Sequence, residues 1–397
     1  MIDSTGVHRA LSATGTLIRT LAVASCLATL CAPSAAQAQT SAGNSKKTER
    51  PPARTAAPAQ PTKPSARSPA PAPAPAESAA SSIDWPSRED VKRFVQMMSE
   101  KHGFDEIELL STFSQARMSE TAVRLMAPAP PGFRRSWTVY RSRFVEPFRI
   151  REGLRFWRDN AAAVSRASQR YGVPPEIIVS IIGVETLYGR QVGDFRVLDT
   201  LTTLAFEYPR RGEYFREELE QYLLLARESG FDPALWKGSF AGAVGLPQFM
   251  PASIRRHAVD FDGDGRIDLR NSPTDAIGSV ARFLANHGWR SGAPTHFTAV
   301  LADEARAQPA VAAGIPPSLN RTDLAAMGVT STQTLPADEP LSLIDLPNGD
   351  QTTSYVLGAH NFYVITRYNR SYFYAMAVID LARELKADQP GKSPIDK

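Results

Sequence analysis

The sequence of 397 residues predicts a mainly α protein of the α+β class, with a helical core, a small β portion and an EF-hand-like loop. Apolar side chains recur at helical spacing across residues 83–386, with clear stripes in Phe144–Tyr171 and Glu213–Arg227. A helix capped by Ser87 is expected at the start of this region and a final helix near Phe373–Lys386. Over 293–357 this period is weak, and frequent Pro, Gly, Thr and Asp indicate loops and short strands. Alternating Asp and Gly within 260–275 are typical of a calcium-binding loop.

The N-terminal residues 1–38 are predicted to be an export signal, because basic residues precede a short apolar run and a cleavage site follows at Ala38. The run is shorter than the roughly 20 residues that span a bilayer, and no later segment is a better candidate, which excludes a channel or transporter. Both cysteines, Cys26 and Cys31, lie in this signal, so the mature chain would have no disulfide and no thiol nucleophile. Val-Ala-Ser-Cys26 resembles a lipoprotein box, so a lipid anchor is the alternative and the one expected route to a membrane.

Residues 39–82 form a predicted linker, followed by a catalytic domain over 83–386 and a flexible tail over 387–397. Nine prolines among Ala, Ser and Thr favour an extended polyproline II spacer. The linker carries six Lys/Arg and two Asp/Glu, whereas residues 83–397 carry 37 and 38. The formal charge of +4 therefore comes from the linker, and the nearly neutral remainder excludes a general nucleic-acid-binding surface.

The carboxylate of Glu185 lies in the most apolar helix that the sequence predicts. Prolines 174 and 175 open this helix, the run Ile177–Tyr188 continues it, and Gly189 closes it. The residues three, four and seven positions before Glu185 are isoleucines, so the carboxylate is expected to face the core or a cleft. Desolvation and the negative end of the helix dipole both favour the protonated acid. Glu185 is therefore a candidate general acid, and a glutamate satisfied by a buried arginine or by backbone is the alternative.

Four motifs follow one another along this domain: Gly183–Gly189, Leu198–Arg211, Gly238–Pro251 and Asn361–Asn369. Together they resemble the membrane-bound lytic murein transglycosylase B family (glycoside hydrolase family 103), and the resemblance covers about residues 83–385. It implies a lysozyme-like fold and a periplasmic enzyme that cleaves the β-1,4 bond between N-acetylmuramic acid and N-acetylglucosamine in peptidoglycan. It also implies 1,6-anhydromuramoyl products, glycan strands as the binding partner, and cell-wall synthesis or division proteins as further partners.

The chemistry agrees with this resemblance, because no second carboxylate of the kind that a hydrolytic glycosidase needs is evident. Asp194, Asp199 and Glu207 are near in sequence, but the last two equally fit a helix cap or a pair with a following arginine. We expect Glu185 to protonate the leaving oxygen, the muramoyl acetamido oxygen to assist, and Glu185 to take the proton of the C6 hydroxyl. A muramidase that hydrolyses the same bond and a non-catalytic peptidoglycan-binding scaffold are the alternative functions.

The resemblance also implies which residues hold the glycan. Small residues in Gly238–Pro251 let the backbone approach a ligand closely. An arginine fork suits lactyl or peptide carboxylates, with a structural salt bridge to a nearby glutamate as the alternative. One tyrosine of the last motif is expected to orient the acid. The predicted contacts are Ser239, Gln248 and Phe249 in the cleft, Arg210 and Arg211 at the carboxylates, and Asn361, Tyr363 and Tyr368 on the far wall.

The segment beginning at Asp260 has the order of ligands found in an EF-hand loop, with a glycine at its sixth position. Asn271 replaces the usual twelfth-position glutamate, and Asp275 is the expected substitute, with a helix-capping role behind Ser272 as the alternative. The predicted ligands are Asp260, Asp262, Asp264, the carbonyl of Arg266, Asp268 and Asp275. We expect a structural Ca²⁺, preferred over Mg²⁺ because the ligands are many and all oxygen, and no organic cofactor.

Overall fold

The computed structural model describes residues 83–389. The predicted export signal, the lipoprotein box at Cys26, the linker 39–82 and the tail beyond 389 lie outside the described residues, so these assignments stay predictions. Within 83–389 the chain is mainly helical with short antiparallel strands, which confirms the predicted fold class.

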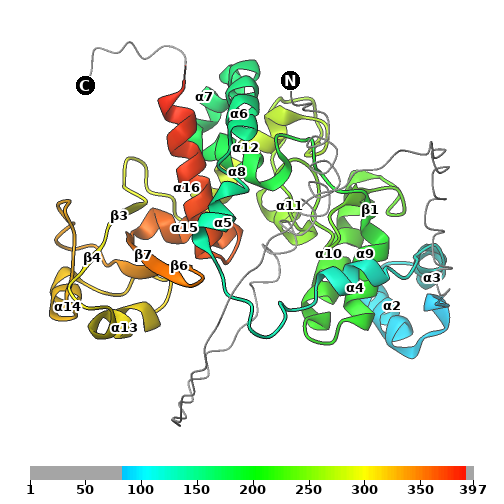
Figure 1. Ribbon diagram of the computed structural model, residues 1–397. Helices are drawn as coiled ribbons and strands as arrows, with labels where there is room; N and C mark the ends of the chain where they lie inside the picture. The colour runs from blue at the N-terminus through cyan, green and yellow to red at the C-terminus, as the bar shows by residue number, and fades with distance from the viewer. Residues whose placement is uncertain (1–82, 390–397) are drawn as a thin grey trace, which may run out of the picture. The chain divides into compact units, whose positions relative to one another are not determined.

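An N-terminal helical group is built on two long helices, α9 and α10, which pack against each other. On the right of Figure 1, α2, α3 and α4 lie beside them. Ser87 does not cap α2 as predicted: it belongs to the short helix η1, which buries Trp85, and α2 begins after Arg88 without a side-chain cap. The group comprises η1 (Trp85–Ser87), α2 (Glu89–His102), α3 (Glu106–Ser114), α4 (Glu120–Leu125), β1 (Phe195–Arg196), α9 (Val197–Glu207), α10 (Gly212–Ser229) and β2 (Lys237–Gly238).

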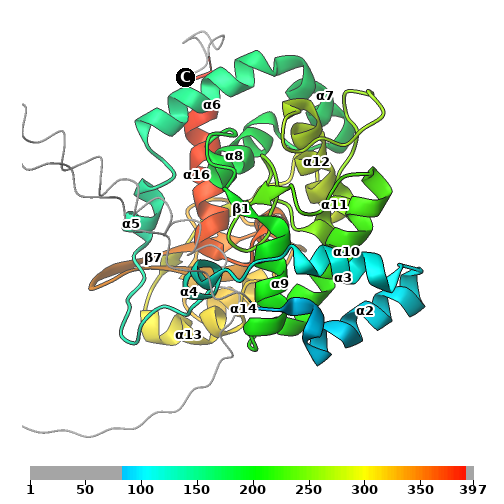
Figure 2. The same cartoon turned by 90° about the vertical axis from the view of Figure 1, so that its right-hand side faces the viewer.

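A central helical group surrounds α8, which packs against α6, α7, α12 and α16, as Figures 1 and 2 also show. The predicted stripe Phe144–Tyr171 is two helices, because Asn160 ends α6 and begins α7. The final helix spans the predicted Phe373–Lys386 and one residue more at each end. The group comprises α5 (Trp137–Ser142), α6 (Pro147–Asp159), α7 (Ala161–Tyr171), α8 (Pro175–Thr186), α11 (Pro251–His257), α12 (Pro273–Asn286), α15 (His360–Tyr368) and α16 (Tyr372–Ala387).

The β portion has its own small apolar cluster, which includes Leu324, Leu343 and Leu357. Its main sheet has the antiparallel order β3-β7-β6, and β4 pairs with β5. Two helices, α13 and α14, were not predicted here, because each buries only one or two side chains and so leaves little periodicity in the sequence. The elements are β3 (His296–Thr298), β4 (Val300–Leu301), α13 (Glu304–Ala312), α14 (Arg321–Ala326), β5 (Val329–Thr330), β6 (Ser342–Asn348) and β7 (Gln351–Gly358).

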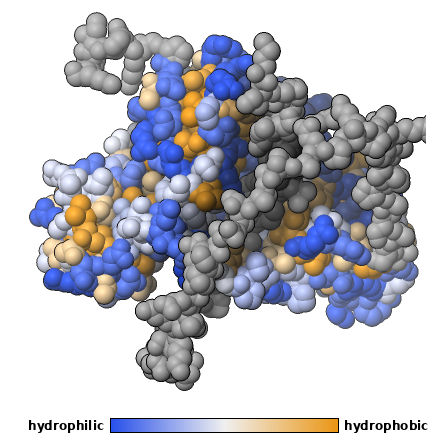
Figure 3. Space-filling view, in the orientation of Figure 1, coloured by the Kyte–Doolittle hydropathy of each residue, from blue (hydrophilic) through white to orange (hydrophobic). Residues whose placement is uncertain are grey.

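The surface seen in Figure 3 is mostly hydrophilic, with separate apolar patches. Exposed large apolar side chains occur singly, for example Val300 on β4 and Leu235 before β2. Among the described residues, no helix combines the length and the apolar character that crossing a bilayer requires.

Candidate active site

The end of α8 differs from the prediction in a way that matters for Glu185. The helix ends at Thr186, and the next three residues, Leu187, Tyr188 and Gly189, all have positive φ. Thr186 holds this reversal in place: its hydroxyl donates to the carbonyl of Leu246 at 2.9 Å and accepts the N–H of Gly189 at 3.1 Å. Glu185 therefore lies in the last turn of a buried helix that is tied to the Gly238–Pro251 loop.

The carboxyl group of Glu185 has one hydrogen-bond donor from another helix. Tyr374 of α16 donates its hydroxyl hydrogen to Oε1 at 2.7 Å, and the Tyr374 side chain is fully buried. Burial raises the pKa of Glu185 to about 8, and the hydrogen bond from Tyr374 opposes this shift. The group is thus protonated at neutral pH, and because Oε1 accepts from Tyr374, its proton is left to Oε2.

Glu185 opens into a cleft of about 430 Å³, which is lined by residues of α8, α10, α11, α12 and α15 and of the Gly238–Pro251 loop. Aromatic side chains make part of its wall: Phe249, Phe283 and Tyr368 contact one another with ring centroids 4.8–5.6 Å apart. Its charged lining residues are Glu185 and Glu218 together with Arg211, Arg256, Arg367 and Arg370. The four arginines form no ion pair with the described residues, and a buried nitrogen of Arg211, Nη1, has no hydrogen-bond partner among them.

Half of the predicted glycan contacts line this cleft: Gln248, Phe249, Arg211 and Tyr368. Gln248 adopts φ 51°, and its amide nitrogen donates to the carbonyls of Gly245 at 2.9 Å and Val192 at 3.1 Å, which leaves its oxygen free for a ligand. The Tyr368 hydroxyl donates to the carbonyl of Pro247 at 2.5 Å rather than to Glu185.

The other predicted contacts do not line the cleft. Ser239 is buried, and its hydroxyl oxygen accepts the N–H groups of Ala241 and Ala243 inside the loop. Asn361 is fully buried and joins α15 to the segment after α12, through both backbone groups of Arg290. The remaining two, Arg210 and Tyr363, are exposed and half-buried respectively. The tyrosine that reaches the acid is Tyr374, so the expectation for Tyr363 and Tyr368 in this role was wrong.

The three carboxylates considered as partners of Glu185 lie elsewhere. Asp194 is exposed, Asp199 forms an ion pair with Arg196 at 3.3 Å, and Glu207 pairs with Arg88 rather than with either following arginine.

The second carboxylate in the cleft is one that sequence reasoning missed, Glu218 of α10. It is buried, burial raises its pKa, and its Oε2 accepts the N–H of Ala252 at 2.9 Å. The signal in the sequence was weak, because Glu218 lies in a helix rich in glutamates. The hydrogen bond from Ala252 to its Oε2 fixes the start of α11.

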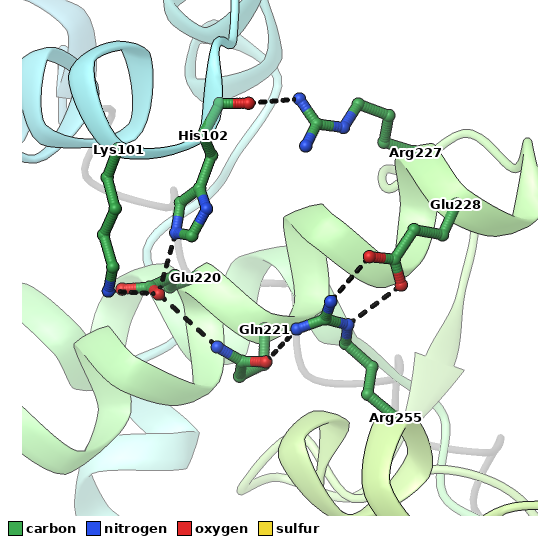
Figure 4. A network of polar contacts seen from close by, with 7 residues as sticks. All are labelled: Lys101, His102, Glu220, Gln221, Arg227, Glu228 and Arg255. Atoms are coloured by element: carbon green, nitrogen blue, oxygen red, sulfur yellow. Dashed lines mark hydrogen bonds and ion pairs between the residues drawn. The ribbon is translucent and has the colours of Figure 1, made fainter.

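A polar network ties α2 and α11 to α10 (Figure 4). Glu220 of α10 forms hydrogen bonds of 2.9 Å with Lys101 Nζ and His102 Nε2. Farther along the helix, Glu228 accepts two hydrogen bonds from Arg255 of α11, at 2.6 and 2.9 Å. Because α11 also forms part of the cleft lining, the network fixes that wall relative to α10.

The EF-hand-like loop over residues 260–275, the calcium-type loop, brings three of its predicted ligands together. Carboxylate oxygens of Asp260, Asp262 and Asp264 lie within 4.8 Å of one another, which suits a cation that binds several oxygens. Asp275 does not join them: its Oδ1 accepts the N–H of Phe261 and its Oδ2 that of Asp268, both at 2.8 Å.

The capping role weighed for Asp275 is not observed either: the Ser272 side chain caps α12 through the N–H of Asp275, whereas the Asp275 carboxylate holds backbone N–H groups of the loop. Asp268 accepts N–H groups of Arg270 and Asn271 at the end of the loop. The N–H of Arg266 donates to Asp264 at 2.8 Å. The donor set of three convergent carboxylates still fits a hard divalent cation.

Comparison with known proteins assigns this chain to a family. The family described as "Transglycosylase SLT domain" matches residues 86–383. The chain is 45% identical over 308 residues to membrane-bound lytic murein transglycosylase B of Escherichia coli (strain K12), covering 76% of this chain and 83% of that protein.

Two solved structures extend this similarity. The structure of catenated lytic transglycosylase SltB1 from Pseudomonas aeruginosa has a TM-score of 0.73 and 44% identity, covering 77% of this chain and all of that one. The Escherichia coli lytic transglycosylase Slt35 in complex with calcium has a TM-score of 0.69 and 43% identity, covering 79% of this chain and 97% of that one. Because the family match covers most of the chain and the relatives are more than 40% identical, the chain belongs to the lytic murein transglycosylases, enzymes that cleave peptidoglycan without hydrolysis.

Proposed function

We propose that Glu185 serves as both acid and base in cleaving the β-1,4 bond between N-acetylmuramic acid and N-acetylglucosamine. Oε2 gives its proton to the glycosidic oxygen as the bond to the anomeric carbon breaks. The acetamido oxygen of the muramoyl residue bonds to that carbon and holds the positive charge. The C6 hydroxyl then attacks the same carbon and displaces the acetamido oxygen, which returns to a neutral amide. The hydroxyl proton passes to the Glu185 carboxylate, and a 1,6-anhydromuramoyl end forms.

One observation carries this proposal: the carboxyl of Glu185 is held at a cleft by Tyr374 in surroundings that keep it protonated at neutral pH. Glu185→Gln preserves the shape and removes the titrating proton. We expect kcat on purified peptidoglycan to fall by at least about 10³-fold, since a group that acts twice in the cycle is lost. Activity within tenfold of wild type, with binding retained, would contradict the assignment of Glu185 as the acid and base.

A muramidase remains the competing reading because Glu218 lies in the same lining. Three features favour a structural role: Glu218 is buried, it accepts the backbone N–H of Ala252, and Tyr214 hydrogen bonds to it. A base that activates water needs a carboxylate oxygen open to that water. The engagement of Oε2 in the start of α11 therefore favours attack by the substrate's own C6 hydroxyl.

The unpaired arginines of the lining suggest which form of the glycan is bound. Arg211 lies over Tyr214, with its guanidinium carbon 4.2 Å from the ring centroid, and its buried Nη1 has no hydrogen-bond partner among the described residues. We expect these arginines to bind lactyl or peptide carboxylates of the strand. An amidase that strips the peptide removes the peptide carboxylates but frees the lactyl carboxylate. The kcat/KM on stripped strands should therefore fall by at least about tenfold if the arginines bind peptide carboxylates, and rise if they bind the lactyl group; equal kcat/KM on both substrates would refute this.

A structural calcium ion is part of the same proposal. Asp260, Asp262 and Asp264 would hold it, with further oxygens from the loop. The ion would neutralise the clustered carboxylates and fix the loop between α11 and α12, without entering the reaction. The similar Slt35 structure contains calcium, which supports the choice of ion.

The enzyme acts on the cell wall, and we place it in the periplasm, exported by the signal over residues 1–38. Anchoring through Cys26 is the alternative route, and it would put the same cleft on a lipid tether. Fractionation of cells that express the full chain separates the two, since only a lipidated form would partition with membranes after a salt wash. Cell-wall synthesis or division proteins stay a prediction as further partners.

A further inference from the structure

The side chain of Tyr188 lies in a slot beneath the last turn of α8, three residues after the acid. It is outside the cleft lining, so it does not contact substrate. Its ring packs on Phe156 of α6, with centroids 5.4 Å apart. Its hydroxyl oxygen is buried and has no hydrogen-bond partner among the described residues. A tyrosine hydroxyl left without a partner indicates that the shape of the ring, rather than a polar contact, is what this position uses.

Two glycines make the room for this ring. A Cβ atom placed on Gly153 of α6 or on Gly183 of α8 would lie closer than 3.0 Å to the ring carbon Cζ of Tyr188, and closer still to its hydroxyl oxygen. The ring therefore sits directly between the backbones of the two helices. Gly183 is five residues before Tyr188 along the chain, so the ring folds back under the helix that bears Glu185.

The backbone dihedral angles show that the turn after α8 is held in an unfavourable conformation. Leu187 and Tyr188 have φ of 51° and 59°, in the left-handed region that residues with side chains rarely adopt. Such conformations persist only where surrounding contacts hold them, and they cluster at functional sites. Two contacts hold this turn: the N–H of Leu187 donates to the carbonyl of Gly183 at 3.1 Å, and the guanidinium of the buried Arg149 donates to the same carbonyl at 3.0 Å.

We propose that Tyr188 is a positioning residue, whose ring wedges between Gly153 and Gly183 and so fixes the direction in which Glu185 enters the cleft. The reversal at Leu187–Gly189 turns the chain back, the ring fills the slot that the glycines leave, and the carboxyl keeps its contact with Tyr374. Loss of the ring frees the last turn of α8 to shift. A misplacement of about 1 Å at a reacting group can cost on the order of 10²-fold in rate.

The inference rests on Glu185 as the acid of the proposed reaction, so Glu185→Gln is measured beside the test variants. Tyr188→Phe keeps the ring and removes only the partnerless hydroxyl, and we expect kcat within about twofold of wild type. Tyr188→Leu removes the wedge, and we expect kcat to fall by at least about tenfold while KM changes by less than about threefold. Circular dichroism and thermal melting check that each variant is folded.

The outcomes are distinct. A folded Tyr188→Leu with wild-type kcat overturns the positioning role, and so does a Tyr188→Phe that loses as much as Tyr188→Leu. If Tyr188→Leu does not fold, Gly153→Ala and Phe156→Leu disturb the ring from α6 without altering α8, and unchanged kcat in the folded variants again overturns it. An active Glu185→Gln would instead refute the proposed function and leave the wedge without a catalytic group to position.

Discussion

Two effects, burial and a hydrogen bond, act in opposite directions on the pKa of Glu185. Removal from water disfavours the carboxylate and raises its pKa, whereas the hydroxyl of Tyr374 stabilises the carboxylate and lowers it. Burial has the larger effect, so the pKa is about 8. A value near the operating pH suits a group that must first give a proton and then take one back.

Tyr374→Phe tests this balance through the pH dependence of the rate. The hydrogen bond favours the charged form, so its loss raises the pKa of Glu185 further above 4.5 and above the present value of about 8. The acid is active when protonated, so activity falls as pH rises through this pKa. The basic limb of kcat/KM should therefore move to higher pH by about one unit, with kcat lowered by about tenfold. A limb that stays in place or moves to lower pH contradicts this account.

The sequence was informative about Glu185 for a definite reason: its setting is local, made by isoleucines on the same helix. Tyr374 could not be assigned, because it lies 189 residues away and is brought to the acid only by the packing of α16 on α8. Ser239 shows the reverse error. Its place in a small-residue motif suggested a ligand contact, but its hydroxyl is used by the N–H groups of its own loop.

Among the elements, the calcium-type loop shows how far ligand spacing can be read from sequence. The three clustered carboxylates repel one another without a cation, and oxygens of Asp260 and Asp262 accept backbone N–H groups within the loop. Asp275 was expected among the ligands, but its position at the start of α12 directs both its oxygens to backbone N–H groups. Sequence spacing could not show this, because it depends on how α12 begins.

Removal of calcium should lower the stability of the protein rather than the rate of the folded enzyme. After chelation and dialysis we expect Tm to rise by several degrees on addition of Ca²⁺, because only the folded loop assembles the site. Asp262→Asn should abolish most of this rise, and Asp303→Asn, at a helix cap outside the loop, should leave it unchanged. A Tm that does not respond to Ca²⁺ in wild type contradicts the proposed site.

Elements that bury a full stripe of side chains were predictable, and those that bury one or two were not. The helices α10 and α16 match their predicted ranges closely, whereas α13 and α14 left no clear pattern. The end of α8 was also misplaced, since a glycine at 189 suggested a longer helix, and the reversal begins instead at Leu187. Contacts with Leu246 and Arg149 decide that point, and both lie outside the helix.

Across the whole molecule, the cleft combines parts that are remote in the sequence. The acid comes from α8, its tyrosine partner from α16, and the basic side chains from the segments before α10, within α11 and at the end of α15. The network at Glu220 and Glu228 holds α10 and α11 together beneath one wall. The resemblance between motifs could therefore indicate the reaction, while the arrangement of the arginines needed the structure.

The most direct test of the single-acid account is the mass of the products released from purified peptidoglycan by wild type, Glu185→Gln and Glu218→Gln. The account predicts 1,6-anhydromuramoyl ends, one water lighter than reducing ends, from wild type and from Glu218→Gln, and no cleavage by Glu185→Gln. Reducing ends from wild type that disappear in Glu218→Gln would show a hydrolase with two carboxylates and would contradict it.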